Sequence, residues 1–261
     1  MNRSSTTCFQ ALLTIAVSLA ALLLLASCKR PDSDRVQGYV EGEFIYVAAA
    51  LPGALESLLV RRGAQVKAGD PLFVLDSGAE KAARDQARAA LTLSEKEFER
   101  LEKLARANLI AMADLDRGRA ARDQDRERLV KAEWDLSQKR QSAPQAGLVF
   151  DTLYREGEWV AAGRPVVALL PPQNTKVRAF VPEARVAAIQ PGDPVRVTVD
   201  GMAGPVAGKI SFISPKAEYT PPVIYSREVR DKMVFMIEMV FDPAIAAKLH
   251  PGQPVDVEFG S

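Results

Sequence analysis

The sequence predicts an elongated protein of mixed α and β structure, in which a small β-sandwich is interrupted by a long α-helical coiled-coil hairpin and followed by a β-barrel. Three observations lead to this prediction. Two similar segments with β character lie 94 residues apart, a stretch rich in helix-forming residues separates them, and short alternating segments fill the last third of the chain. The 34 basic and 33 acidic residues nearly cancel, which argues against a general electrostatic affinity for nucleic acid.

The N-terminal segment has the layout of a bacterial lipoprotein signal peptide. Arg3 is the only charged residue before a long uncharged stretch, which stops at the sequence LASC of residues 25–28. We therefore expect residues 1–27 to be removed and Cys28 to be the site of lipidation. An uncleaved membrane anchor is the alternative, and both place the body of the protein outside the cytoplasm. Residues 28–50 are expected to form a tether and the first barrel strand.

The two halves of the predicted sandwich repeat each other without a gap. Gly53 to Asp76 aligns with Gly147 to Leu170, and nine of 24 positions are identical, among them three glycines and a proline. Each copy is typical of a strand, a tight turn, a short strand, a turn and a final strand. Glycine permits the positive φ of such turns, and proline interrupts strand pairing. We assign residues 51–76 and 143–170 to one split domain.

Residues 77–142 are predicted to form the helical hairpin, because they are rich in Ala, Leu, Glu, Lys, Arg and Gln and contain no proline. Ser77 can cap the first helix. A spacing of four and three residues marks the inward row of this helix, which consists of Ala87, Leu91, Ser94, Phe98, Leu101 and Ala105. The second arm keeps the spacing at Leu115, Leu129, Ala132 and Leu136. Gly118, Arg122 and Asp125 fall between these residues, so we expect loose packing or another register there.

The insertion must reverse its direction, because the two halves of the sandwich have to meet. A single helix of this length would hold them about 100 Å apart at 1.5 Å per residue. The segment from Asn108 to Asp114 fits the break best, since Asn adopts the left-handed cap conformation and Asp favours a helix N-terminus. Each arm would then reach roughly 45 Å. A solvated helical linker is the alternative.

Residues 171–261 are predicted to form the β-barrel domain. Apolar and polar residues alternate in short runs such as 195–199 and 255–259, as expected for strands. The sequence Pro-Gly-x-Pro-Val occurs at 191–195 and again at 251–255, each time after a short stretch of helical character.

The run Gly-x-x-Val-x-x-Gly-x-Pro-Leu of residues 63–72 resembles the half-motif of biotinyl and lipoyl domains. Two such halves split by a long insertion resemble the HlyD, or membrane fusion protein, family, which implies a lipoyl-like sandwich. Residues 219–226 are similar to a stretch in adaptors of the YbhG type, which serve ABC exporters. A true lipoyl or biotinyl carrier with Lys81 as its modified residue is the alternative. Such carriers hold the lysine on a tight hairpin between the halves, where this chain has its long insertion.

The resemblance implies a periplasmic adaptor of an efflux or secretion system, anchored by its lipid, with the inner membrane favoured. Its expected partners are an inner-membrane transporter, ABC type favoured, a TolC-like outer-membrane channel, and further copies of itself in a hexamer. Adaptors that dock onto such channels carry Arg, Leu and Ser near the hairpin apex; Arg100 and Leu104 match, and Ala111 stands where Ser is expected. A periplasmic scaffold or substrate-delivery lipoprotein without channel docking is the alternative, and Ala111 favours it.

No catalytic arrangement emerges from the sequence. The single histidine, His250, precedes a turn and has no nucleophile or metal-ligand cluster at a recognisable spacing. We expect no enzymatic activity, no cofactor and no metal.

Overall fold

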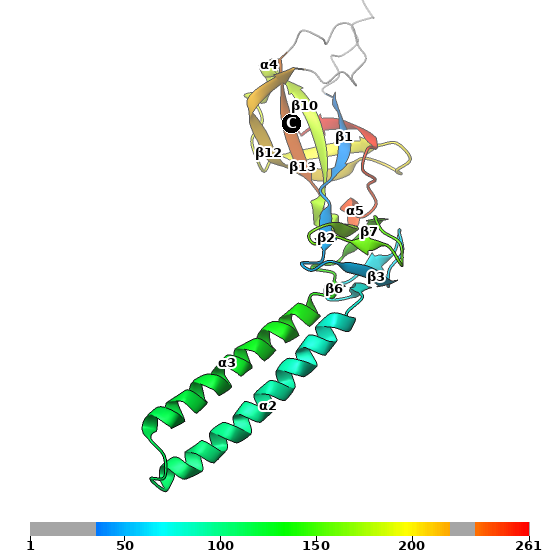
Figure 1. Cartoon of the computed structure of the whole chain (residues 1–261). Coiled ribbons are helices and arrows are strands. Elements are labelled where there is room, and N and C mark those ends of the chain that lie inside the picture. The colour runs from blue at the N-terminus through cyan, green and yellow to red at the C-terminus, as the bar shows by residue number, and fades with distance from the viewer. Residues whose placement is uncertain (1–34, 220–232, 261) are drawn as a thin grey trace, which may run out of the picture.

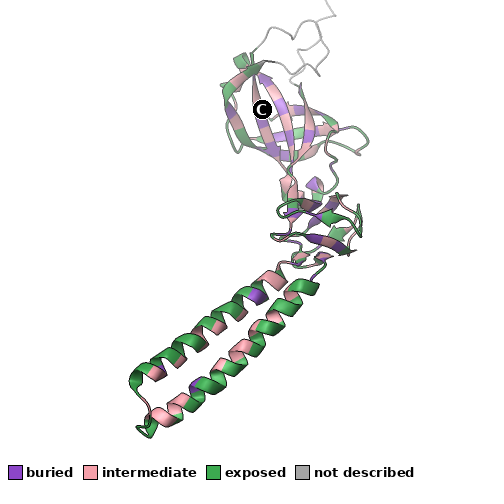
Figure 2. Cartoon of the chain, viewed as in Figure 1, coloured by how far each residue is buried: buried purple, intermediate pink, exposed green. Residues whose placement is uncertain are grey.

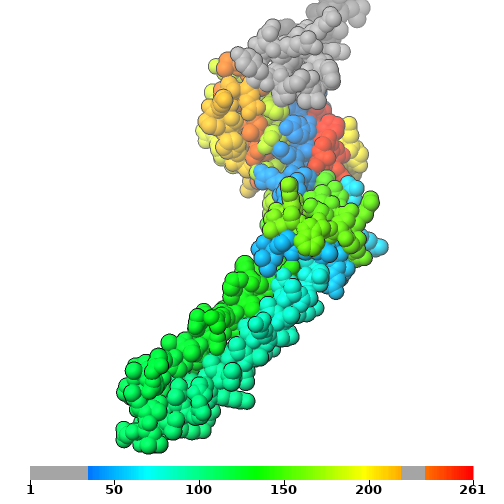
Figure 3. Space-filling model, in the orientation of Figure 1, coloured from blue at the N-terminus to red at the C-terminus, as the bar shows by residue number. Residues whose placement is uncertain are grey.

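The computed structural model describes residues 35–219 and 233–260 of this elongated protein. A β-barrel lies at one end, a β-sandwich in the middle, and a helical hairpin extends from the opposite side of the sandwich (Figure 1). The space-filling view shows the hairpin as a slender rod beside the two thicker β domains (Figure 3). The predicted fold class is confirmed. The predicted signal peptide, Cys28 and most of the stretch 219–226 lie outside the described residues.

The repeat seen in the sequence is a repeat of three strands. The first half contains β3 (Gly53–Leu58), β4 (Gln65–Val66) and β5 (Pro71–Leu75), and the second contains β7 (Gly147–Thr152), β8 (Trp159–Val160) and β9 (Pro165–Leu170). The four turn glycines have positive φ in matching positions, namely Gly63, Gly69, Gly157 and Gly163. Because this backbone region is strained for residues with a Cβ, glycine is required at each of these turns.

The two halves exchange their middle strands. One sheet has the order β2-β9-β7-β4 and the other β6-β5-β3-β8, so each sheet contains two strands of one half and the short strand of the other. The fully buried Leu72, Phe73, Val149 and Leu169 fill the space between the sheets. The flanking strands β2 (Ile45–Ala48) and β6 (Arg140–Ser142) pair with β9 and β5. The sandwich therefore extends beyond the expected limits of 51 and 143.

The insertion is an antiparallel pair of helices, α2 (Gly78–Arg106) and α3 (Met112–Ser137). Most of their surface is exposed, and the less exposed residues follow the sides on which the helices face each other (Figure 2). The row predicted for the first helix is the row that faces inward, with Phe98 buried. Ser77 occupies the N-cap position without capping through its side chain; the carboxylate of Asp76 accepts from Gly78 N–H at 3.0 Å instead.

The middle of α3 was expected to pack loosely or in another register, but Gly118 and Arg122 both lie against the inward row of α2. A Cβ at Gly118 would overlap Leu101, so the glycine makes room for the leucine of the opposite helix. The Arg122 guanidinium lies 4.3 Å from the centre of the Phe98 ring and covers it. A small residue and a cation–π contact thus fill the place of apolar residues.

The barrel is closed by six strands in the order β1-β10-β13-β12-β11-β14. Their bounds are Arg35–Gly42 for β1, Thr175–Pro182 for β10, Pro194–Val199 for β11, Val206–Tyr219 for β12, Met233–Val240 for β13 and Pro254–Phe259 for β14. The one-turn helices α4 (Glu183–Val186) and α5 (Pro243–Ala246) precede two glycine turns of positive φ, at Gly192 and Gly252. The 3-10 helix Pro172–Asn174 leads from the sandwich into β10.

Valines of these strands form most of the barrel core, which is separate from the core of the sandwich.

Among the helices of the described segments, none is both long and apolar enough to cross a membrane.

Candidate docking surfaces

The apex of the hairpin is built on Asn108, which has a φ of 55°. Asn108 N–H donates to Ala105 O and Leu109 N–H donates to Leu104 O, both at 2.9 Å. This pair of bonds is the Schellman arrangement, in which a left-handed residue lets the chain satisfy the last carbonyls of a helix. The prediction that Asn108 ends the first helix is therefore confirmed.

Two of the three expected tip residues lie at this apex. Leu104 is half-buried and its carbonyl accepts the bond that closes α2. Ala111 is the exposed N-cap residue of α3 and makes no side-chain cap. Arg100 lies one turn before Leu104, on the shaft, where its Nη2 is 2.6 Å from Glu97 Oε1. The role of these residues in docking stays a prediction.

Two large apolar residues at the apex are strongly exposed. Leu109 is 69% exposed and Met112 is 64% exposed, on either side of Ala111. Sequence reasoning did not select them as site residues. The sequence did contain a sign of their exposure. Both are apolar residues in a predicted break between two highly charged helices, where no facing helix is available to bury them.

The shaft of the hairpin also carries exposed apolar residues, Leu93 on α2 and Val130 and Trp134 on α3, each more than half exposed. The ion pair between Arg88 and Glu133, with a distance of 2.7 Å, indicates on which face of the hairpin each of these apolar residues lies. Each partner of this pair follows an inward-facing residue by one position, so residues one position after the inward rows share a face of the hairpin.

Val130 follows the inward Leu129 by one position, so it lies on the Arg88–Glu133 face, and Trp134 lies one turn further along the same side. Leu93 precedes the inward Ser94 and therefore lies on the opposite face. Leu93 and Val130 both fall between the Arg88–Glu133 pair and the contact of Arg122 with Phe98. Leu93 and Val130 are thus on opposite faces at a similar height, and Trp134 lies just beyond Glu133.

A charge network lies on the outer surface of the barrel near the sandwich. Lys176 Nζ is 2.7 Å from Glu43 Oε1 and 3.1 Å from Glu238 Oε2, and Arg178 Nη2 is 2.9 Å from Glu238 Oε1. The hydrogen bond to Glu43 raises the pKa of Lys176, although burial opposes this. Burial acts to raise the pKa of Glu238, but the bonds from Arg178 and Lys176 outweigh it and hold the pKa below 4.5. The network ties β10 and β13 to the segment directly after β1.

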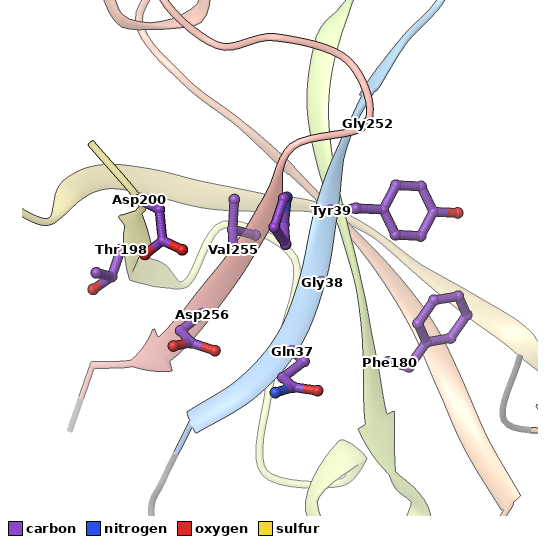
Figure 4. A pocket seen from close by; sticks show the side chains of 10 residues that line it. Gln37, Gly38, Tyr39, Phe180, Thr198, Asp200, Gly252, Val255 and Asp256 are labelled. Atoms are coloured by element: carbon purple, nitrogen blue, oxygen red, sulfur yellow. The ribbon is translucent and has the colours of Figure 1, made fainter. Parts of the chain in front are cut away.

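A groove of about 600 Å³ crosses the outer surface of β1, β10, β11 and β14. Tyr39 and Phe180, whose ring centres are 6.4 Å apart, lie on one side of it, and Thr198 and Asp200 lie on the other (Figure 4). These side chains alternate with residues of the barrel core, which explains why they face outward.

The other two residues considered from the sequence, Lys81 and His250, lie in different domains. Lys81 is exposed on the first turn of α2, and His250 is exposed in the loop before β14. Within residues 35–219 and 233–260, no three side chains of His, Cys, Asp and Glu are grouped to hold a metal ion.

Known proteins resemble this chain over most of its length. No family model matches it. The UPF0194 membrane protein YbhG of Salmonella gallinarum (strain 287/91) is 31% identical, with 88% of this chain and 90% of that protein covered.

Two solved structures share the fold. One is a MacA–MexA chimeric protein that contains the Pseudomonas aeruginosa MexA α-hairpin domain (TM-score 0.70, 20% identity, 86% of this chain and 77% of that chain). The other is the membrane fusion protein Spr0693 of Streptococcus pneumoniae R6 (TM-score 0.65, 23% identity, 87% and 98%). The chain therefore belongs to the YbhG family of UPF0194 membrane proteins and has the fold of the membrane fusion, or periplasmic adaptor, proteins.

Proposed function

We propose that this protein is a periplasmic adaptor that links an inner-membrane transporter, of ABC type, to a TolC-like outer-membrane channel. The observation that carries the proposal is the apex of the hairpin. It presents Leu109 and Met112 to solvent at the far end of the molecule from the barrel. Exposed apolar side chains grouped at the tip of a charged rod favour docking onto another protein. The role is mechanical coupling rather than catalysis.

The sequence and the relatives support a location on the periplasmic side of a membrane. Lipidation of Cys28 would tether the chain at its N-terminal side, and β1, the first described strand, belongs to the barrel. The barrel would then lie near the anchoring membrane, inner membrane favoured, with the hairpin pointing away from it. Two similar proteins are named a "membrane protein" and a "membrane fusion protein", which supports a location at a membrane.

A ring of copies, hexameric by family resemblance, would complete the adaptor. Leu93 lies on one face of the hairpin and Val130 on the opposite face at a similar height, with Trp134 one turn closer to the sandwich. In a closed ring, each copy contacts the next through two different surfaces, and rotation about the ring axis preserves height. This placement of the apolar residues therefore supports side-by-side packing of hairpins.

The test is co-purification of the lipidated, detergent-solubilised protein from its native host after mild crosslinking. Leu109→Asp and Leu104→Asp are compared with the wild type. Because Leu109 is exposed and Leu104 is half-buried, Leu109→Asp removes the docking surface without disturbing the helix end. Ala120→Asp, an exposed position of the α3 shaft, is the matched control. We expect the wild type and Ala120→Asp to recover an ABC subunit and a channel, and Leu109→Asp to lose the channel alone.

One observation favours the second candidate, a periplasmic scaffold or substrate-delivery lipoprotein. Ala111 leaves α3 without a side-chain cap at the position where channel-docking adaptors carry Ser. If no form of the protein recovers a transporter subunit, the adaptor proposal fails and this second function takes its place.

A further inference from the structure

The hairpin joins the sandwich through two very short connections. Only Asp76 and Ser77 lie between β5 and α2, and only Gln138 and Lys139 lie between α3 and β6. The direction of the whole rod is therefore set within a few residues. With a 29-residue α2 of about 44 Å, each 10° of pivot at this joint moves the apex by about 8 Å.

Apolar packing does not fix this joint. The core of the sandwich includes no residue of α2 or α3 among those described, and the buried residues of the two helices, Phe98, Leu115 and Ala132, face the other helix instead. Polar contacts must therefore determine how the hairpin sits on the sandwich.

Lys139 supplies such contacts from a buried position. Its side chain is only 5% exposed, and its Nζ donates to Pro52 O at 2.6 Å and lies 2.9 Å from Glu80 Oε1. Pro52 directly precedes β3 of the sandwich, whereas Glu80 belongs to the first turn of α2. One ammonium group thus connects the sandwich to the first arm, while its own backbone belongs to the end of the second arm.

The surroundings are shaped to hold this group. A Cβ at Gly53 would lie 3.2 Å from Lys139 Nζ, so the glycine leaves space for the ammonium beside β3. The backbone of Lys139 is also held, because Leu75 N–H donates to Lys139 O at 2.8 Å. A buried ammonium is costly unless it is paired and hydrogen-bonded, and both conditions are met here.

We propose that Lys139 is a positioning residue that fixes the direction of the hairpin relative to the sandwich through Pro52 and Glu80. The role of Lys139 in fixing the direction of the hairpin does not depend on the adaptor role, whereas its consequence for channel docking rests on the proposed function. Loss of the ammonium leaves the two short connections and the backbone bond between Leu75 and Lys139, so the rod samples a wider range of directions while each domain stays folded.

The experiment is a distance measurement by double electron–electron resonance in the full-length, detergent-solubilised protein. Spin labels are attached at Gln65→Cys on the sandwich and Ala107→Cys at the apex, two exposed positions. Protein without added cysteines is the blank for Cys8 and Cys28. We expect a narrow distribution in the wild type and a distribution at least twice as wide in Lys139→Met. Glu80→Gln, which keeps a hydrogen-bond acceptor, should give an intermediate width.

Lys131→Met is the matched control, because Lys131 pairs with Asp135 on the same helix and does not touch the sandwich. It should leave the distribution unchanged. An equally narrow distribution in Lys139→Met or Glu80→Gln, at a temperature where circular dichroism shows native helix content, would overturn the proposal. If Lys139→Met does not fold, Glu80→Gln decides alone. Loss of channel recovery in Lys139→Met with a narrow distribution would count against positioning and leave the adaptor role intact.

Discussion

The β domains and the hairpin are stabilised in different ways. The sandwich and the barrel each enclose a set of fully buried apolar side chains, whereas the two helices bury only Phe98, Leu115 and Ala132 and expose mostly charged residues. Stability should therefore reside mainly in the β domains, and interactions with other proteins in the hairpin. Substitutions of the same kind in the two regions test this difference.

The largest effect is expected in the sandwich core. Phe73 is fully buried between the sheets, so Phe73→Ala should lower the free energy of unfolding by about 4 kcal/mol, the cost of lost burial and a new cavity. Urea denaturation followed by circular dichroism measures this loss. Leu59→Ala, at a half-exposed position of the same domain, should change it by less than about 0.5 kcal/mol. Similar losses in both variants would contradict the proposed core.

An intermediate effect is expected from the charge network of the barrel. Glu238→Gln removes the partly buried carboxylate that pairs with Lys176 and Arg178, which should cost about 2 kcal/mol at pH 7. The pKa of Glu238 is lowered in the folded state, so the unfolded state binds more protons below pH 4.5. Its contribution is therefore present above pH 4.5 and lost as the pH falls further.

Thermal unfolding between pH 3 and 7 measures how steeply stability falls with acidity. This acid slope should be shallower in Glu238→Gln than in the wild type. Glu99→Gln is the matched change on the hairpin. The bond from Lys103 lowers the pKa of Glu99, but this carboxylate is fully exposed and screened by solvent. Its removal should leave the acid slope unchanged. An equal change of slope in both variants would show that ion pairs stabilise the two regions alike.

A smaller effect is expected at the seam of the hairpin. Arg122→Ala uncovers the Phe98 ring and should cost about 1 kcal/mol. Arg126→Ala removes an exposed arginine 3.9 Å from Asp123 and should cost less than about 0.5 kcal/mol. The loss of helical signal on heating distinguishes the two. No difference between them would mean that the cation–π contact adds nothing to this helix pair.

Backbone geometry made much of the fold predictable. Turns of positive φ require glycine, so Gly63, Gly69, Gly157 and Gly163 preserved the repeat where most other positions changed. Asn108 is recognisable for the same reason, as a non-glycine residue that tolerates the left-handed region. Local conformational demands of this kind are visible in a single sequence.

Features that depend on a distant partner were missed or misjudged. Gly118 and Arg122 looked like interruptions of the seam because their fit depends on Leu101 and Phe98 of the other arm. The strand β2 was placed outside the sandwich because it has no counterpart in the repeat and pairs with a strand more than a hundred residues later.

The candidate sites were predictable only in part. The apex could be located from the break in the helices, but the exposure of Leu109 and Met112 requires the folded turn. Lys139 could not be singled out, since its sequence context is that of any solvated lysine near the end of a charged helix. Its burial results from the meeting of three segments, at Pro52, Glu80 and Lys139 itself.

The smallest effect on stability should accompany the largest effect on assembly. Trp134→Glu and Leu93→Glu change exposed residues on opposite faces of the shaft, so neither should lower the free energy of unfolding by more than about 0.5 kcal/mol. Each variant should nevertheless lose self-association in sedimentation velocity, because each removes one side of the contact between neighbouring copies. A mixture of the two should recover pairs at most, since each copy keeps one intact surface.

Leu109→Glu is the matched control for this last comparison, with the same change of charge at the apex instead of the shaft. It should self-associate like the wild type while losing the channel. If Trp134→Glu associates normally, the copies meet through the β domains alone and the apolar faces of the shaft contact something else. If it instead unfolds, the hairpin carries more of the stability than its exposed surface indicates, and the division between stable β domains and an interacting hairpin is wrong.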